Sequence, residues 1–307
     1  MLKKVNFSQK FGLNISGHHD IDFVDINIEG DSLLFIDPCL IECCNDDLSK
    51  TCSATISDYF GKLYTVLKDD NVPEIYRHLS HLGERNEARL GYGNGRNGKA
   101  KTAEGMIKTL SGLRRLITDG IPLEKAIDIP ILMPRFERDC MSDMLLNVLY
   151  KPLSEYTIQQ CQLWGIPTVY STATKYYWDF EEHCWKIYHG KSLVIGGETI
   201  LLVPKRYVCK GLYYSTSHFF LSKIAPMLQN RDVVIIDGKQ QKPNKQEVKK
   251  AESKEHGSLL DATVTYAKIY PKLLSEYHAD IPIKYYQRCL SDDVLDKLLY
   301  GTMTESA

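Results

Sequence analysis

The sequence predicts an α/β or α+β fold in which a mixed sheet is flanked by helices. Two observations support this class. Apolar residues recur at helical spacing over much of residues 55–163, whereas short aromatic and β-branched runs follow from residue 168, which favours strands. We therefore expect a mainly helical half with an N-terminal β-hairpin at residues 1–166 and an α+β half at residues 167–307, or one continuous domain that contains both.

The composition describes an ordinary globular protein, with 43% hydrophobic and 25% charged residues. No apolar run approaches the about 18 residues that a membrane span requires, and the first residues lack the apolar core and cleavage site of a signal peptide. The 9 cysteines are odd in number and form no C-x-x-C pair, so we expect reduced, mostly buried thiols. We expect a cytoplasmic protein without a membrane partner.

The predicted N-terminal hairpin joins residues 21–28 to residues 32–37. Branched and aromatic residues alternate with acids in the first segment until Gly30 interrupts the run. Asp37 precedes Pro38 and ends the second strand. It is either a catalytic carboxylate at the end of a strand or a turn former.

Amphipathic spacing then predicts three helices, over residues 55–67, 73–90 and 102–119. The second helix carries His78, His81, Glu84 and Glu87 at intervals of three residues. Residues at this interval drift around a helix, so at most two or three of them reach one ion. The histidines are either ligands or partly buried polar groups, and the two glutamates, which adjoin the following loop, are better metal candidates.

The following loop, residues 91–102, is rich in glycine and contains Arg96, Lys99 and Lys101. Backbone N–H groups beside glycines can hold phosphates. The loop almost fits a P-loop, but Ala100 stands where Ser or Thr binds magnesium, and a helix precedes it instead of a strand. Both departures argue against a nucleotidase, and leave a contact to a phosphate backbone or a mobile basic surface loop.

Charge is segregated along the chain, although the formal net charge is only −1. Residues 20–58 are rich in acids and contain Lys50 as their one cation, whereas Arg and Lys dominate residues 85–115. This pattern suits a site that handles a polyanion together with a divalent ion. It equally suits two faces that pair with each other.

The central stretch, residues 135–147, predicts a helix with two chemically distinct faces. One face is apolar, and the other carries Asp139, Ser142, Asp143 and Asn147. Two carboxylates one turn apart, followed by an amide, are hard oxygen donors that suit Mg²⁺, Mn²⁺ or Ca²⁺. The alternative is that the acids only cap the helix and complement its dipole.

Two further segments complete the prediction. Residues 127–134 contain two prolines and predict an edge strand or an extended lead-in. Residues 198–208 form the most strand-like stretch, with Lys205 near its end. A lysine in this position can orient a nucleophilic water in nucleases whose carboxylates hold the metal, although the spacing is too long for the D/E-x-K arrangement.

Three blocks resemble an uncharacterised bacterial family that is associated with mobile or defence islands. They read LFIDP at residues 34–38, RDCMSD at 138–143 with Tyr156-Thr157, and LVPK at 202–205. The family has a hydrophobic residue where Cys140 stands, which leaves the spacing of the acids intact. The resemblance covers most of the chain and implies a set of residues to test, but no established activity.

The first hypothesis is a metal-dependent nuclease that acts on DNA or RNA, with a role in bacterial antiphage defence. Asp139 and Asp143 would hold Mg²⁺ or Mn²⁺, with Glu84 or Glu87 completing the site, and Lys205 would stabilise developing phosphate charge. Four cations would bind the nucleic acid, namely Arg96, Lys99, Lys101 and Arg138. The alternative is a non-catalytic subunit of a larger complex that binds nucleic acid or a partner protein.

Overall fold

A computed structural model describes residues 5–92, 103–133, 136, 138–231, 234–236, 239–285 and 288–301. Helices account for 55% of it and strands for 11%. All strand pairs in these ranges are antiparallel and belong to small separate sheets. The prediction of a mixed helix and sheet protein is therefore confirmed in its α+β form.

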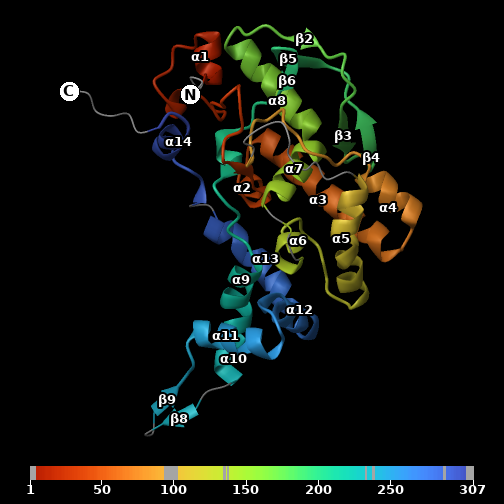
Figure 1. Cartoon of the computed structure of the whole chain (residues 1–307), viewed down its shortest axis with the longest axis vertical. Coiled ribbons are helices and arrows are strands. Elements are labelled where there is room, and N and C mark those ends of the chain that lie inside the picture. The colour runs from red at the N-terminus through yellow and green to blue at the C-terminus, as the bar shows by residue number, and fades with distance from the viewer. Residues whose placement is uncertain are drawn as a thin grey trace, which may run out of the picture.

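Helix α3 (Asp47–Lys68) lies at the centre of the body, where other helices pack on it (Figure 1). Asp46 begins it by accepting the backbone N–H of Ser49, and its buried face carries Tyr59, Phe60 and Leu63. The helices against it are α2 (Pro38–Glu42), α4 (Val72–Leu79), α5 (Ala103–Thr118), α7 (Arg138–Val148) and α8 (Tyr150–Leu163). Pro152 lies in the first turn of α8, where its missing N–H costs no hydrogen bond.

The strands cover one side of this helical body (Figure 1). A three-stranded sheet contains β2 (Val169–Tyr170), β5 (Lys191–Ile195) and β6 (Glu198–Ile200). A hairpin is formed by β3 (Tyr176–Asp179) and β4 (Cys184–Ile187). Helices α7 and α8 both pack on β3, and α8 also packs on β5. A separate pair joins β1 (Phe35–Ile36) to β7 (Val208–Cys209).

The C-terminal helices extend from one end of this body (Figure 1). They are α9 (Thr216–Phe219), α10 (Ala225–Arg231), α11 (Lys245–Glu255), α12 (Leu259–Ile269) and α13 (Lys272–Tyr285). A hairpin of β8 (Val234–Ile236) and β9 (Lys239–Gln241) lies at the far tip. Helix α14 (Asp292–Leu299) returns to the N-terminal segment, where α1 (Phe7–Phe11) and the short helix η1 (His18–Asp20) lie.

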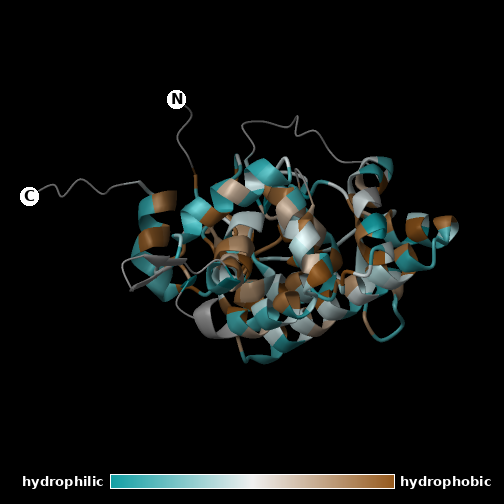
Figure 2. Cartoon of the chain, turned by 90° about the horizontal axis from the view of Figure 1, so that it is seen from below, coloured by the Kyte–Doolittle hydropathy of each residue, from teal (hydrophilic) through white to brown (hydrophobic). Residues whose placement is uncertain are grey.

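The helices carry both apolar and polar residues along their length (Figure 2), as expected when one face is buried and the other is exposed. In the part of the chain that the structure describes, no helix is both long and apolar enough to cross a membrane. All nine cysteines are free thiols, and Cys39, Cys52, Cys161 and Cys209 are buried. The absence of disulfides among them agrees with the prediction, but only four of the nine are buried, fewer than expected.

The predicted N-terminal hairpin does not form. The second segment pairs instead with β7, while Phe23 forms a bridge with Pro204 and Asn27 with Asn6. Residues 23–26 are all buried, so this segment has no solvent face of the kind that a two-stranded hairpin would leave. Partners that are distant in sequence have replaced the local turn.

Two other predicted elements differ from the structure. Residues 127–134 predict a strand, but α6 (Asp128–Leu132) is a helix whose Pro130 lies in the first turn, where a missing N–H is harmless. The strand predicted over 198–208 ends at Ile200, and Pro204, which cannot donate to a ladder, precedes the short helix η2 (Lys205–Tyr207).

The helix predicted over residues 73–90 ends at Leu79. Gly83 weakens helix propensity beyond this point, and the chain gains non-local pairing instead. The Ser32 N–H donates to the Arg89 carbonyl over 2.8 Å, and the Leu201 N–H donates to the Glu87 carbonyl over 2.9 Å. Residues 82–90 therefore run as a non-helical segment between Ser32 and the end of β6, with a turn in which the Arg89 N–H donates to the Asn86 carbonyl over 3.2 Å.

Candidate functional site

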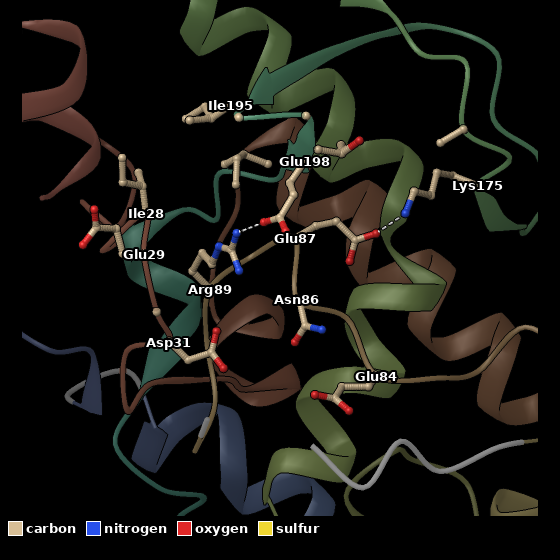
Figure 3. A pocket seen from close by; sticks show the side chains of 16 residues that line it. Ile28, Glu29, Asp31, Glu84, Asn86, Glu87, Arg89, Lys175, Ile195 and Glu198 are labelled. Carbon is tan, nitrogen blue, oxygen red and sulfur yellow. Dashed lines mark hydrogen bonds and ion pairs between the residues drawn. The ribbon is translucent and has the colours of Figure 1, made fainter. Parts of the chain in front are cut away.

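A pocket of about 710 Å³ opens where three chain segments meet (Figure 3). Residues 28–31 form one wall, residues 84–89 the floor, and the turn between β5 and β6 the opposite wall. Lys175, which precedes β3, completes the lining. The hydrogen bonds of segment 82–90 to Ser32 on one side and to Leu201 on the other therefore hold the two walls of the pocket in place.

Two carboxylates of this pocket, Asp31 and Glu84, lie within electrostatic reach of Asp143 on α7, as does Asp139, and we call these four the carboxylate cluster. Asp31 and Glu84 line the pocket, while Asp139 and Asp143 come from α7. Burial and the negative charges of Asp139, Glu84 and Asp31 raise the pKa of Asp143 to about 8. A 3.4 Å hydrogen bond from the Arg85 N–H acts in the opposite direction but is outweighed. Each carboxylate thus lies within electrostatic reach of the others.

Asp31 was not predicted as a site residue. Burial raises its pKa, and the charges of Glu84 and Asp139 add to the effect, while Arg89 opposes it. The only sequence signal that pointed to it was the acid-rich composition of residues 20–58. Composition cannot select one acid, because Asp31 reaches the cluster only through the pairing of Ser32 with the segment that ends at Leu90.

Gly91 lets the Asp139 carboxylate approach the chain closely. A Cβ at Gly91 would lie 2.9 Å from Asp139 Oδ1, and the φ angle of 137° is unfavourable for any other residue. The Asp139 carboxylate therefore lies against the backbone of Gly91, which directly follows segment 82–90 and the pocket floor.

Helix α7 has the two faces that the sequence predicts. Met141, Met144, Leu145 and Val148 are buried in the core. Asn147 on the polar face uses its amide to hold the pocket floor, since its Oδ1 accepts from Arg85 Nε over 2.7 Å and its Nδ2 donates to the Gly83 carbonyl over 2.7 Å. The amide is therefore engaged in structure, and the two aspartates remain as the metal candidates on this face.

Glu87 was predicted as a metal ligand, and the structure places it in a buried ion-pair group. It accepts from Lys175 Nζ over 2.5 Å and from Arg85 Nη1 over 3.2 Å. Burial alone would raise its pKa, but Arg85 and Lys175 outweigh burial and the pKa is lowered. Its charge is balanced by Arg85 and Lys175.

Arg89 supplies a further cation to the pocket. It forms an ion pair with Glu198 on the opposite wall (Figure 3). Its Nε is buried and has no acceptor among the described residues. Among those same residues, no cation forms an ion pair with Asp31, Glu84 or Asp143.

The carboxylate cluster is not arranged as a finished metal site. In the described ranges, no three His, Cys, Asp or Glu side chains are grouped closely enough to hold an ion. An ion would therefore require the carboxylates of the cluster to turn toward one another. Such a rearrangement suits acids that repel each other when no cation separates them.

The two candidate histidines and Asp37 have packing and capping roles. His78 stacks on Tyr59 with ring centroids 4.4 Å apart, and burial lowers its pKa to about 4. His81 stacks on Tyr176 at 3.6 Å. Asp37 caps α2 by accepting the Cys39 N–H over 2.8 Å. Of the two roles that the sequence left open for each residue, the described contacts of His78, His81 and Asp37 correspond to the structural one.

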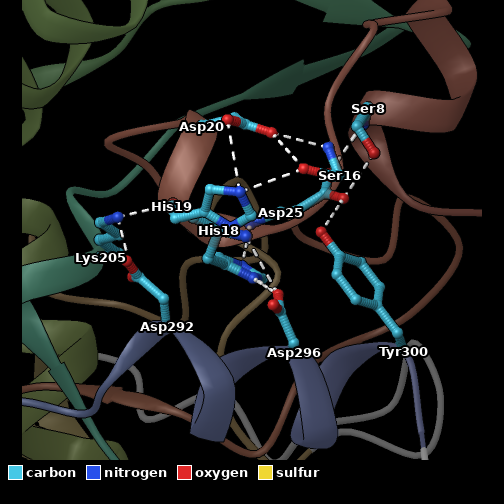
Figure 4. A network of polar contacts seen from close by, with 10 residues as sticks. All are labelled: Ser8, Ser16, His18, His19, Asp20, Asp25, Lys205, Asp292, Asp296 and Tyr300. Atoms are coloured by element: carbon cyan, nitrogen blue, oxygen red, sulfur yellow. Dashed lines mark hydrogen bonds and ion pairs between the residues drawn. The ribbon is translucent and has the colours of Figure 1, made fainter. Parts of the chain in front are cut away.

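Lys205 lies in a second polar group (Figure 4), which we call the His18 network. Its Nζ forms a 2.8 Å ion pair with Asp292 and donates to the His18 carbonyl over 2.6 Å. The network also contains Asp25, Asp296 and Tyr300. Lys205 does not line the pocket, because the strand that was expected to carry it ends five residues earlier, at Ile200.

The predicted nucleic-acid contacts divide into two groups. Arg96, Lys99 and Lys101 lie outside the described residues. Arg138 begins α7, and its guanidinium lies over the rings of Phe35 and Tyr92, at 4.6 Å and 4.9 Å from their centroids. Arg138 directly precedes Asp139 in the sequence and is therefore adjacent to the carboxylate cluster.

Comparison with known proteins gives one family. No curated protein and no solved structure matches the chain. The model of the domain of unknown function DUF8370 matches residues 12–215, a range that contains all the pocket residues and ends where α9 begins. Because this match covers about two thirds of the sequence, the protein belongs to the DUF8370 family.

Proposed function

We propose that the protein is a metal-dependent nuclease whose carboxylate cluster binds Mg²⁺ or Mn²⁺ and hydrolyses phosphodiester bonds. The observation that carries the proposal is that burial and three neighbouring acids raise the pKa of Asp143 to about 8, and that two of these acids, Asp31 and Glu84, line an open pocket. Acids whose pKa is shifted strongly by burial and by neighbouring charges are typical of functional sites. Carboxylate oxygens are the ligands that Mg²⁺ and Mn²⁺ prefer.

Asp139 and Asp143 would be the principal ligands, with Glu84 and Asp31 completing the site. A divalent ion supplies Lewis-acid activation of a water and neutralises charge on a phosphate. Arg89, with a donor that lacks an acceptor in the described structure, would contact the phosphate. Glu87, paired with Lys175, would hold the floor rather than the ion.

The proposal makes metal binding dependent on pH. Asp143 keeps its proton up to about pH 8, so an ion that binds it must displace the proton. The affinity for Mn²⁺ should therefore rise about tenfold per pH unit between pH 6 and 8 and then level off. Titration calorimetry in buffers of different ionisation enthalpy would detect the released proton.

The direct test is cleavage of plasmid, single-stranded DNA and RNA with Mg²⁺, Mn²⁺ or EDTA. We expect the parent protein to cleave with Mg²⁺ or Mn²⁺ and not with EDTA. We expect neither Asp139→Asn nor Asp143→Asn to cleave under any of these conditions. Asp47→Asn is the matched control, because it neutralises an exposed acid in the first turn of another helix. Absence of metal-dependent cleavage on all three substrates would contradict the proposal.

A non-catalytic protein would give a different pattern. It would bind nucleic acid or a partner protein in EDTA, and neutralising the aspartates would leave that binding unchanged. A role in bacterial defence rests on the resemblance of the three sequence blocks and stays a prediction.

A further inference from the structure

A half-exposed tyrosine is held rigidly beside the carboxylate cluster. Tyr92 is 46% exposed, and its ring packs against buried Phe35 with centroids 5.0 Å apart. Arg138 lies over both rings, and its Nε donates to the Tyr92 hydroxyl over 2.5 Å. A large aromatic side chain is thus fixed in place while almost half of its surface meets solvent.

Arg138 is fixed in turn from its other side. Its Nη1 donates to the Lys210 carbonyl over 2.5 Å. A Cβ at Gly211 would lie 2.7 Å from Arg138 Nη1, so the glycine makes room for the guanidinium. Because two of its donors serve Tyr92 and Lys210, we assign Arg138 the role of a positioning residue for Tyr92.

The chain places this tyrosine next to the proposed reaction centre. Tyr92 follows Gly91, whose backbone lies against the Asp139 carboxylate. Arg138, which holds the ring, immediately precedes Asp139. A nucleotide in contact with Tyr92 would therefore have its phosphate within reach of the carboxylate cluster.

We infer that Tyr92 is a stacking platform for an unpaired base, and that the substrate is single-stranded DNA or RNA. In a duplex the faces of the bases are covered by neighbouring bases, so a rigid ring at the surface can stack only on an unpaired or terminal base. Stacking on aromatic side chains tolerates every base, which suits a nuclease without sequence preference. This inference rests on the proposed function for the location of the reaction centre.

The test measures binding in EDTA, where cleavage cannot interfere. Fluorescence anisotropy would follow labelled single-stranded DNA, single-stranded RNA and a DNA duplex at one salt concentration. We expect Tyr92→Ala to weaken both single strands about tenfold or more and to leave duplex binding unchanged. Tyr92→Phe should bind within about twofold of the parent, because the ring remains and only the hydroxyl is lost.

Tyr76→Ala is the matched control, since Tyr76 is 47% exposed on α4 and has no place in the site. Melting curves verify that each variant is folded, and Tyr92→Leu, which keeps an apolar side chain, replaces Tyr92→Ala if that variant unfolds. The inference is overturned if the folded variant binds single strands as tightly as the parent does. It is also overturned if the affinity for the duplex falls by the same factor as the affinity for single strands. Loss of single-strand binding by a protein that cleaves nothing would support the platform and reject the nuclease.

Discussion

The carboxylate cluster and the His18 network are both rich in acids, but Asp25 and Asp296 in the network accept more hydrogen bonds than Asp143 does in the cluster. In the network (Figure 4), Asp25 is fully buried and accepts three hydrogen bonds. They come from the Ser8 N–H over 2.7 Å, the Ser8 hydroxyl over 2.6 Å and the Tyr300 hydroxyl over 2.8 Å. Donated hydrogen bonds replace the water contacts that a carboxylate loses on burial.

The other acids of the network are also matched. Asp296 accepts from the His18 N–H over 3.0 Å and from His18 Nδ1 over 2.5 Å. The Asp25 N–H donates to His18 Nε2 over 3.1 Å, so Nδ1 carries the proton of a neutral ring. Asp292 pairs with Lys205. These contacts join α14 to the N-terminal segment, which is a structural role.

The difference separates acids that stabilise the fold from the acids that we propose to bind a metal ion. Acids of the network gain donors on burial, whereas Asp143 gains negative neighbours and one long hydrogen bond. The cluster therefore lowers stability at neutral pH, and a protein keeps such an arrangement where an activity requires it. Experiments that remove one acid from each group should move stability in opposite directions.

The largest effect is expected for Asp143→Asn. The folded pKa of about 8 lies above the ordinary 3.8, so the folded state binds more protons and the parent loses stability as pH rises from 4 to 8. The variant has no such loss and should be more stable in EDTA at pH 7, by at most about 4 kcal/mol. Urea unfolding at pH 5 and 7 measures this, and an equal difference at both pH values would reject the explanation.

Asp25→Ala should move stability the other way. It leaves the Ser8 N–H, the Ser8 hydroxyl and the Tyr300 hydroxyl without their acceptor, at a cost of about 3 kcal/mol. Asp20→Ala, which removes a solvent-exposed acid of the same segment, should lower the melting temperature much less. Similar melting temperatures for the two variants would show that the network does not stabilise the fold.

Lys175→Met tests the balanced acid that lies inside the pocket. Glu87 would keep only Arg85 as its cation, with an expected loss of about 2 kcal/mol at pH 7. The folded pKa of Glu87 lies below 4.5, so the stability from this pairing is present above that pH and disappears as pH falls through the folded pKa. The variant and parent should therefore converge in acid, once Glu87 is protonated in both. Lys186→Met, at an exposed ion pair, should lower the melting temperature at pH 7 less than Lys175→Met does.

Local patterns in the sequence predicted the helices and the acidic face of α7, but not the pocket. The helical period correctly separated Asp139 and Asp143 from the apolar residues of the same helix. Asp31 and Arg89 could not be found in this way, because the pairing of Ser32 with Leu90 places them and no local period encodes it. The same non-local pairing replaced the predicted helix beyond Leu79.

The smallest effect is expected for Lys205→Met. Its ion pair with Asp292 is partly exposed, so the loss of stability should be less than about 1 kcal/mol. Metal-dependent cleavage should be unchanged, because Lys205 lies in the His18 network and not in the pocket lining. Lys205→Arg, which retains the charge, is the control for the ion pair. If cleavage instead falls a hundredfold while the melting temperature holds, Lys205 acts on the substrate as the sequence predicted, and the two acidic groups belong to one functional surface.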